Sequence, residues 1–447
     1  MAVLNELGVS DVLPPLCGLN SLAERLPRTL IALVGTRTEA FLAHFVPDSF
    51  STSLPRPRGA HGSRVVTIVL EPGETPTQGN IAERLIEASA GFGGIDSVLL
   101  IAGSSAALIG VDPAFEAKIA TRRLDLPVRA VTPDPGASAA LSTDLEDRAL
   151  ATILDLCPHS RGGPVVIDPD SPPPAKRRGR LGGLLERGRS EVQDRTRRRR
   201  PVVLLGAAGS GTRAGLSEAL TKAGVEVAGS VPGAGTKELP ALGEGTVVAV
   251  ADPYLASAAR AAEKRGAKVV ETLMPIGVDG TARFIQDVSA EAGQEASELL
   301  RVRSAWEDLG PLRNRIRGKR IFLAGDTGLE IPLARFLIDA GAVVLEVGAP
   351  RLERKLLKAE IRTLSAHVDV VESPDPKGQM GRIAATRPDI VVASPGLYTP
   401  LVARGHLCRS SLDFLGAGIH GYEGARRILE LFISTFERAE ALDSVRL

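Results

Sequence analysis

The stretch "VVLLGAAGSGTRAGL", residues 202–216, contains a run of four apolar residues, a glycine-rich turn and the start of a helix. A continuous apolar run of this length is typical of a strand covered on both faces. Gly206 and Gly211 have the spacing of a phosphate-binding loop, but Thr212 stands where such a loop needs a lysine. The dinucleotide fingerprint also fails, because its third glycine comes one residue late. We therefore interpret the stretch as a strand-to-helix turn of an α/β unit.

The same order of strand, small-residue turn, helix and strand occurs three times along the chain. The continuous apolar runs are IALV (31–34), VLLI (98–101), VVLL (202–205), VVAV (247–250), IFLA (321–324) and IVVA (390–393). Alternating strands and helices of this kind predict an α/β fold of three Rossmann-like domains with doubly wound parallel sheets. Ligands of such sheets bind beyond the carboxyl ends of the strands. Four turns fall there, at residues 35–39, 103–105, 206–212 and 325–328.

The chain is long enough for several domains, with 447 residues of which 44% are hydrophobic. The predicted parts are a first domain (1–165), a basic linker (166–200), a second domain (201–317), a third domain (318–418) and a C-terminal helix (419–447). Residues 171–200 hold eleven lysines and arginines against three acidic residues, with prolines and glycines, which is typical of a linker. In the last helix one apolar face, formed by Ile428, Leu431, Phe432 and Phe436, predicts packing back onto the body.

Composition limits the function classes. The formal net charge is +1, so nothing global indicates nucleic-acid binding. No apolar run reaches membrane-spanning length and no secretory signal pattern begins the sequence, which favours a cytoplasmic protein without a membrane span. The three cysteines, Cys17, Cys157 and Cys408, are far apart, so neither a disulfide framework nor a complete metal site within one chain is indicated.

Four stretches, taken in order, resemble the family of N subunits of light-independent (dark-operative) protochlorophyllide reductase, relatives of nitrogenase component 1. They are "LCGLNSLAERLPRTLIALVGTRT" (16–38), "VAVADPYLASAARAAEKRGAKVVETLMPIGVDGT" (248–281), "GKRIFLAGDTGLEIPLARFLIDAGAVVLEVGAP" (318–350) and "RPDIVVASPGLYTPLVARG" (387–405). The similarity spans nearly the whole chain apart from residues 171–200.

The resemblance implies a subunit of an oxidoreductase complex that reduces a ring double bond of a chlorophyll-pathway tetrapyrrole. It implies a homologous B-type subunit as partner in a heterotetramer. It also implies a separate ATP-dependent iron–sulfur protein as electron donor. ATP would bind only to that donor, which explains why this chain has no working phosphate loop.

The resemblance further implies a [4Fe-4S] cluster shared with the partner subunit, for which the family's N subunit supplies three cysteines. In this chain Cys17 occupies the first position and Glu39 the second. The third is Ser104 when counted back from Asp112, or Ser105 when counted forward from Gly103. Thiolates are the usual ligands of such clusters, and a carboxylate can substitute more readily than a serine hydroxyl. The expected metal ligand is therefore Cys17, with Glu39 and Ser104 as oxygen ligands.

A second departure concerns the substrate cleft. After "TPLVARG" the family has a tryptophan that helps to form the tetrapyrrole site, whereas this chain has Cys408-Arg409-Ser410-Ser411. The remaining candidates for the cleft wall are Tyr398, Leu401 and His420.

Two rival functions remain open, and no catalytic residue is assigned. The first is a cluster-free structural or regulatory partner of a catalytic nitrogenase-like subunit, which the loss of two thiols favours. The second is a glycosyltransferase-like enzyme that uses sugar nucleotides, for which Arg213 and the scattered histidines are weak support.

Overall fold

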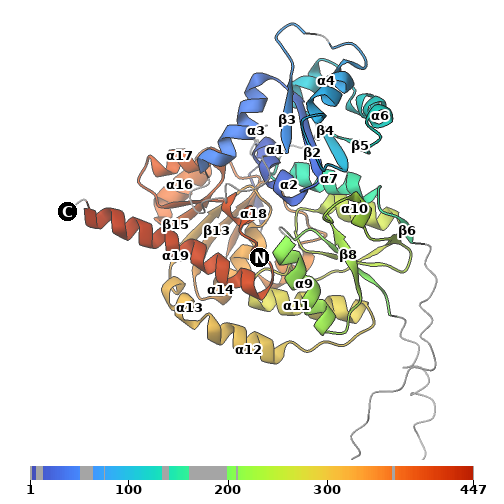
Figure 1. Ribbon diagram of the computed structural model, residues 1–447. Coiled ribbons are helices and arrows are strands. Elements are labelled where there is room, and N and C mark those ends of the chain that lie inside the picture. The colour runs from blue at the N-terminus through green and yellow to red at the C-terminus, as the bar shows by residue number, and fades with distance from the viewer. Residues whose placement is uncertain are drawn as a thin grey trace, which may run out of the picture.

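The computed structural model describes residues 3–6, 14–50, 64–74, 76–132, 140–160, 199–207, 210–364 and 368–445. Three parallel sheets, each with helices against it, make up the body (Figure 1). The predicted α/β class with Rossmann-like doubly wound sheets is confirmed. The predicted basic linker falls almost wholly on residues 161–198, outside the described ranges.

The first sheet has the strand order β3-β2-β4-β5. Its strands are β2 (Thr29–Gly35), β3 (Val65–Val69), β4 (Ser97–Ala102) and β5 (Val128–Val131). The helices of this part are α1 (Pro14–Cys17), α2 (Leu19–Arg25), α3 (Arg37–Phe50), α4 (Asn80–Ser89), α5 (Ser104–Leu108), α6 (Pro113–Leu124) and α7 (Asp144–Leu154). Every residue of β2 and β4 is buried, as the continuous apolar runs predict.

The second sheet has the order β11-β10-β7-β8. Its strands are β7 (Val202–Leu205), β8 (Val227–Val231), β10 (Val247–Val250) and β11 (Lys268–Val269). The helices here are α9 (Ser210–Lys222), α10 (Ala256–Lys264) and α11 (Val278–Glu291), and α12 (Leu299–Asp308) and α13 (Gly310–Ile316) lead to the third sheet. A short 3-10 helix, η1 (Thr236–Glu238), lies between β8 and β10.

The third sheet has six strands in the order β1-β14-β13-β12-β15-β16. They are β1 (Val3–Asn5), β12 (Arg320–Ala324), β13 (Val343–Ala349), β14 (Asp369–Glu372), β15 (Ile390–Ala393) and β16 (Cys408–Ser410). Its helices are α14 (Glu330–Asp339), α15 (Lys358–Thr363), α16 (Pro376–Thr386), α17 (Pro395–Val402) and α18 (Asp413–Gly416).

The edge strand β1 corrects the expected placement of the first residues. The sequence analysis assigns them to the first domain, but β1 pairs in parallel with β14 of the third sheet. The side chain of Arg382 on α16 strengthens this attachment by hydrogen-bonding Glu6 at 2.6 Å. A three-residue strand has too little pattern to reveal its partner, so this pairing depends on tertiary contacts.

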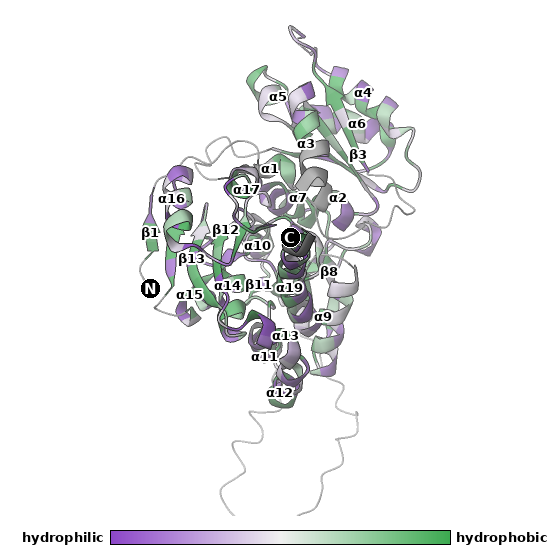
Figure 2. Ribbon diagram, turned by 90° about the vertical axis from the view of Figure 1, so that its left-hand side faces the viewer, coloured by the Kyte–Doolittle hydropathy of each residue, from purple (hydrophilic) through white to green (hydrophobic). Residues whose placement is uncertain are grey.

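Two further elements join the parts. A small parallel pair links β6 (His159–Ser160) to β9 (Leu242–Gly243), and the long helix α19 (Gly421–Val445) runs across the third sheet's side of the molecule (Figure 1). The face of α19 that the sequence predicts to pack inward is buried, at Ile428, Leu431, Phe432 and Phe436. Figure 2 shows the apolar strands lying inside a layer of helices with polar outer faces.

Candidate functional site

The carboxyl ends of strands from the second and third sheets carry buried acids that the sequence analysis did not single out. Asp252 follows β10 closely, and its Oδ1 lies 2.7 Å from Nε2 of His420, which precedes α19. Its Oδ2 accepts a hydrogen bond of 2.9 Å from the backbone N–H of Ala207, in the glycine-rich turn. Burial by itself would raise the pKa of Asp252, but His420 and Arg25 hold it below its usual value. Asp252 is therefore an ionised carboxylate enclosed by the protein.

Gly206 is part of the same arrangement. Its φ of +91° lies in the left-handed region, and a Cβ there would approach Asp252 Oδ2 to 2.5 Å. A side chain at this position would therefore be strained and would displace the carboxylate. The glycine of the turn makes room for a protein acid.

A buried charged network continues from Asp252 toward the first sheet. Arg25, at the end of α2, pairs with Glu146 of α7 and donates hydrogen bonds to Tyr254 Oη at 2.7 Å and to the Leu415 carbonyl at 2.9 Å. Burial would lower the pKa of Arg25, but Glu146, Tyr254 and Asp252 together raise it. We call Arg25, Glu146, Tyr254, Asp252 and His420 the central network; it connects α2 and α7 to the segment after β10 and to the segment between α18 and α19.

A second buried acid, Asp326, follows β12. It accepts hydrogen bonds from Ser142 Oγ at 2.7 Å and Ser411 Oγ at 2.8 Å. Burial raises its pKa above the usual value, against the effect of these two hydroxyls. Cys17 is also buried, and burial together with the neighbouring charge of Asp326 raises the pKa of its thiol to about 12. Cys17 is therefore a protonated thiol at neutral pH.

Glu39, at the start of α3, lies across the ends of β2 and β4. Its carboxylate accepts hydrogen bonds from the Thr36 N–H at 2.8 Å, the Thr36 hydroxyl at 3.2 Å, the Ser105 N–H at 3.2 Å and the Ser105 hydroxyl. Burial would raise the pKa of Glu39, but the bonds from Ser105 and Thr36 lower it. A Cβ on Gly35 or Gly103 would come within 2.6 Å of this carboxylate, so both glycines leave space for it.

The structure distinguishes the two alternatives for the third cluster position. Ser105 is hydrogen-bonded to Glu39, whereas Ser104 is exposed at the start of α5. Glu39 and Ser105 are thus brought together, and Cys17 instead interacts electrostatically with Asp326. Within the described ranges, no group of three or more His, Cys, Asp and Glu side chains could hold a metal ion.

These residues do not fit their expected share of a [4Fe-4S] cluster. Thiolates are the usual ligands of such a cluster, and Cys17 is the single cysteine at the three positions that are cysteines in the family. Both oxygens of Glu39 already accept hydrogen bonds, and the Ser105 hydroxyl is a donor to one of them.

The predicted wall residues lie in two places. Leu401 is fully buried in the apolar cluster of the third sheet, with Val391 and Cys408, and Tyr398 of the same helix packs against that cluster. His420 instead belongs to the central network. Burial and the neighbouring Cys408 and Asp413 raise the pKa of Tyr398. The role of Tyr398, Leu401 and His420 in substrate binding stays a prediction.

Sequence reasoning missed Arg25, Glu146, Asp252 and Asp326. A signal existed for two of them, because "VAVAD" and "FLAGD" each place an aspartate just after a buried strand, where ligand-binding groups of α/β sheets gather. Arg25 and Glu146 are ordinary polar positions in amphipathic helices, and only their tertiary pairing distinguishes them.

The class of protein follows from the fold and from a comparison of the sequence with family models. Residues 15–437 match the family model described as nitrogenase component 1 type oxidoreductase. The chain belongs to this family.

Its relatives narrow the comparison. The chain is 33% identical over 442 residues to the light-independent protochlorophyllide reductase subunit N of Heliobacterium modesticaldum, covering 98% of this chain and 96% of that protein. It is 38% identical over 245 residues to the protein of that name from Roseiflexus castenholzii, covering 55% of this chain and 59% of the relative. The solved structure titled "Nitrogenase Cp1 at pH 6.5" superposes with a TM-score of 0.64 at 13% identity, covering all of this chain and 94% of the other. Among the described residues, no helix combines the length and apolarity needed to cross a bilayer.

Proposed function

We propose that this chain is the N-type subunit of a nitrogenase-like reductase complex that reduces a protochlorophyllide-type tetrapyrrole. A homologous B-type subunit would complete the heterotetramer, and a separate ATP-dependent iron–sulfur protein would supply the electrons. The observation that carries the proposal is the similarity to subunit N of light-independent protochlorophyllide reductase over 98% of the chain. In this function the chain would position the partner subunit and form one side of the tetrapyrrole cleft, with Tyr398, Leu401 and His420 as candidate wall residues.

One structural observation favours a second candidate, a cluster-free structural or regulatory partner of a catalytic subunit. Both oxygens of Glu39 already accept hydrogen bonds from Thr36 and Ser105, and Cys17 is the single thiol at the three positions that are cysteines in the family. The chain therefore offers one thiol where the family offers three. In this case the B-type partner would carry the redox chemistry.

The test is anaerobic co-expression with the cognate B-type subunit, followed by iron and sulfide analysis and a protochlorophyllide reduction assay with the ATP-dependent donor protein. The informative variant is Cys17→Ser, and Cys157→Ser is its matched control because both thiols are buried and have raised pKa values. Under the first function the complex reduces the pigment when the donor protein and ATP are supplied. A lower iron content in Cys17→Ser but not in Cys157→Ser would show that Cys17 holds iron despite the missing thiols.

Other outcomes discriminate between the candidates. A complex that forms and whose iron content is equal in both variants supports the cluster-free partner, whether or not it reduces protochlorophyllide. Failure to associate with the B-type subunit contradicts both functions.

A further inference from the structure

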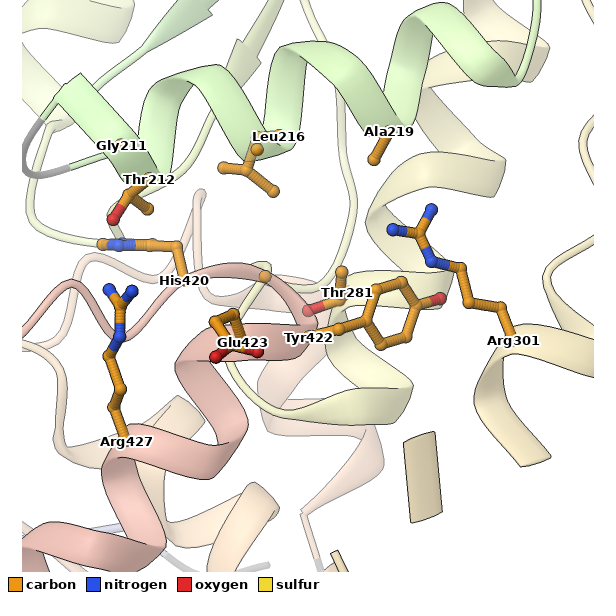
Figure 3. Close-up of a pocket in the computed structure, with 12 residues that line it drawn as sticks. Gly211, Thr212, Leu216, Ala219, Thr281, Arg301, His420, Tyr422, Glu423 and Arg427 are labelled. Carbon is orange, nitrogen blue, oxygen red and sulfur yellow. The ribbon is translucent and has the colours of Figure 1, made fainter. Parts of the chain in front are cut away.

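A cavity of about 240 Å³ lies between α9, α11, α12 and the start of α19 (Figure 3). The glycine-rich segment that opens α9 forms one wall, through Gly211 and Thr212. The buried side chains Leu216 and Ala219 continue that wall. The cavity lies beside His420 of the central network.

Positive charge dominates the lining. Arg427 and Arg301 both contribute to it, and Glu423 is the one acidic side chain among the described lining residues. Figure 3 shows Arg427 directed toward His420 and Thr212 at one end, and Arg301 beside Tyr422 at the other. Arg427 donates one hydrogen bond, of 3.2 Å, to the Gly418 carbonyl, and a guanidinium has four further N–H groups. Arg301 lies over the Tyr422 ring, 4.7 Å from its centroid.

One buried nitrogen of the cavity lining has no hydrogen-bond partner among the residues that the structure describes. It is Nδ1 of His420, whose Nε2 is bonded to Asp252. His420 is itself a lining residue, with a side chain that is 2% exposed. An unsatisfied buried polar atom costs free energy, and a bound ion is one of the few explanations for it.

The position of α9 adds to the attraction for an anion. This helix has 13 residues, and Gly211 and Thr212 of its amino-terminal turn line the cavity. The partial positive charge of a helix N-terminus favours anions. Arginine side chains and a helix start bind phosphate oxygens, and the imidazole of His420 donates to them when both of its nitrogens carry protons.

We propose that this cavity binds a phosphate group, either free phosphate or a small phosphomonoester. The cavity is smaller than the pockets of about 300–1,000 Å³ that hold drug-sized ligands, so its size favours a small phosphate compound over a nucleotide. The site shares His420 with the candidate wall of the tetrapyrrole cleft but involves neither Cys17 nor Glu39, and phosphate binding is measured without the reductase assay. It also gives the glycine-rich segment a ligand, although the lysine of a nucleotide loop is absent.

The test measures binding of inorganic phosphate, and separately of glycerol phosphate, to the full chain at constant ionic strength by calorimetry. Thermal unfolding at increasing phosphate gives a second readout, because a ligand of the native state raises Tm. We expect saturable binding that Arg427→Gln and Arg301→Gln each weaken about tenfold, as expected for loss of a charged hydrogen bond. Tighter binding of inorganic phosphate would identify free phosphate as the ligand, and tighter binding of glycerol phosphate would identify a phosphomonoester.

Arg426→Gln is the matched control, because Arg426 neighbours Arg427 on α19 but does not line the cavity. It should leave both the affinity and the rise in Tm unchanged. Both test arginines are exposed, so their loss should not unfold the chain. Absence of saturable binding would overturn the proposal, and so would an equal loss of affinity in Arg426→Gln, which would indicate general surface charge.

Discussion

At the scale of single residues, the most informative position is Glu39. Its carboxylate caps the ends of two parallel strands and depends on glycine at Gly35 and Gly103 for space. From sequence it is a candidate cluster ligand, because it occupies a cysteine position of the family. In the structure it is a hydrogen-bond acceptor that joins α3 to α5 through Ser105. A carboxylate can serve either as an oxygen ligand of a metal or as a hydrogen-bond acceptor inside the protein. The residue type alone therefore does not distinguish these two roles.

Replacing Glu39 with Gln should destabilise the chain. The amide places donors where Thr36 and Ser105 already donate, and leaving such groups unsatisfied costs about 1–3 kcal/mol. The measurement is the free energy of unfolding in urea at pH 7. The pKa of Glu39 in the folded chain is lowered from 4.5. The stability that its ionised carboxylate contributes is therefore present above pH 4.5 and is lost as the pH falls through the pKa of the folded state.

The difference between the wild type and Glu39→Gln should therefore shrink in acid. Glu87→Gln, on the exposed face of α4, is the control and should change stability little at any pH. A Glu39→Gln protein as stable as the wild type at pH 7 would contradict the capping role.

Glu330 has the opposite dependence on pH. Burial raises its pKa to about 7 from 4.5, although Thr327 donates to it through both N–H and hydroxyl. Between these pH values the folded chain keeps a proton that the unfolded chain releases, so the wild type loses stability as pH rises. The loss is at most about 1.4 kcal/mol per pH unit, and it stops above the folded pKa.

Glu330→Gln removes this titration while keeping the side-chain shape. We expect its unfolding free energy, measured relative to the wild type, to increase between pH 5 and pH 8. Measurements on Glu87→Gln over the same range give the baseline. A difference that stays constant with pH would show that Glu330 is charged throughout.

At the scale of elements, α19 shows how an amphipathic helix closes a multidomain chain. Phe432 is fully buried and its ring centroid lies 5.7 Å from that of Phe414 on α18. The spacing of the apolar residues of α19 is visible in the sequence, whereas the residues that pack against this helix come from distant segments. By contrast, β1 gives no readable signal, and only its pairing with β14 identifies it as a strand.

Phe432→Ala should lower the free energy of unfolding by about 3–5 kcal/mol, because it leaves a cavity in the core. The change is measured by chemical denaturation monitored by circular dichroism. Leu442→Ala, on the same helix but 59% exposed, should change stability little. Equal effects of the two substitutions would mean that α19 does not pack through the observed face.

At the scale of the whole molecule, the central network connects segments from the beginning, the middle and the end of the chain. Arg25 comes before the first sheet, Asp252 and Tyr254 follow β10, and His420 precedes α19. The contacts among them cross more than 100 residues of sequence. A buried ion pair adds little net stability over a hydrophobic pair, but breaking one leaves a charge without its partner.

Arg25→Ala should therefore cost about 3–5 kcal/mol by leaving Glu146 unpaired. The double substitution Arg25→Met with Glu146→Leu should recover most of that loss, because no buried charge of the pair remains. Denaturant unfolding measures both, and Arg303→Ala, whose exposed partner is Glu307, is the control expected to have little effect. Failure of the double variant to recover stability would mean that Arg25 acts mainly through Tyr254 and Leu415.

The sequence alone was enough to predict the α/β class, the three parallel sheets, the turns at the strand ends and the inward face of the last helix. These features follow from local periodicity, since continuous apolar runs and glycine turns act within about 20 residues. It was also enough to indicate the nitrogenase-like family, through stretches spread over nearly the whole chain.

Only the tertiary structure decided what occupies the strand ends. Whether Glu39 faces a ligand or Ser105, whether Asp252 meets His420, and whether Arg427 borders a cavity depend on contacts between segments far apart in the chain. Such contacts leave no periodic pattern in sequence, because burial and pairing of a charged side chain are set by the residues that fold against it.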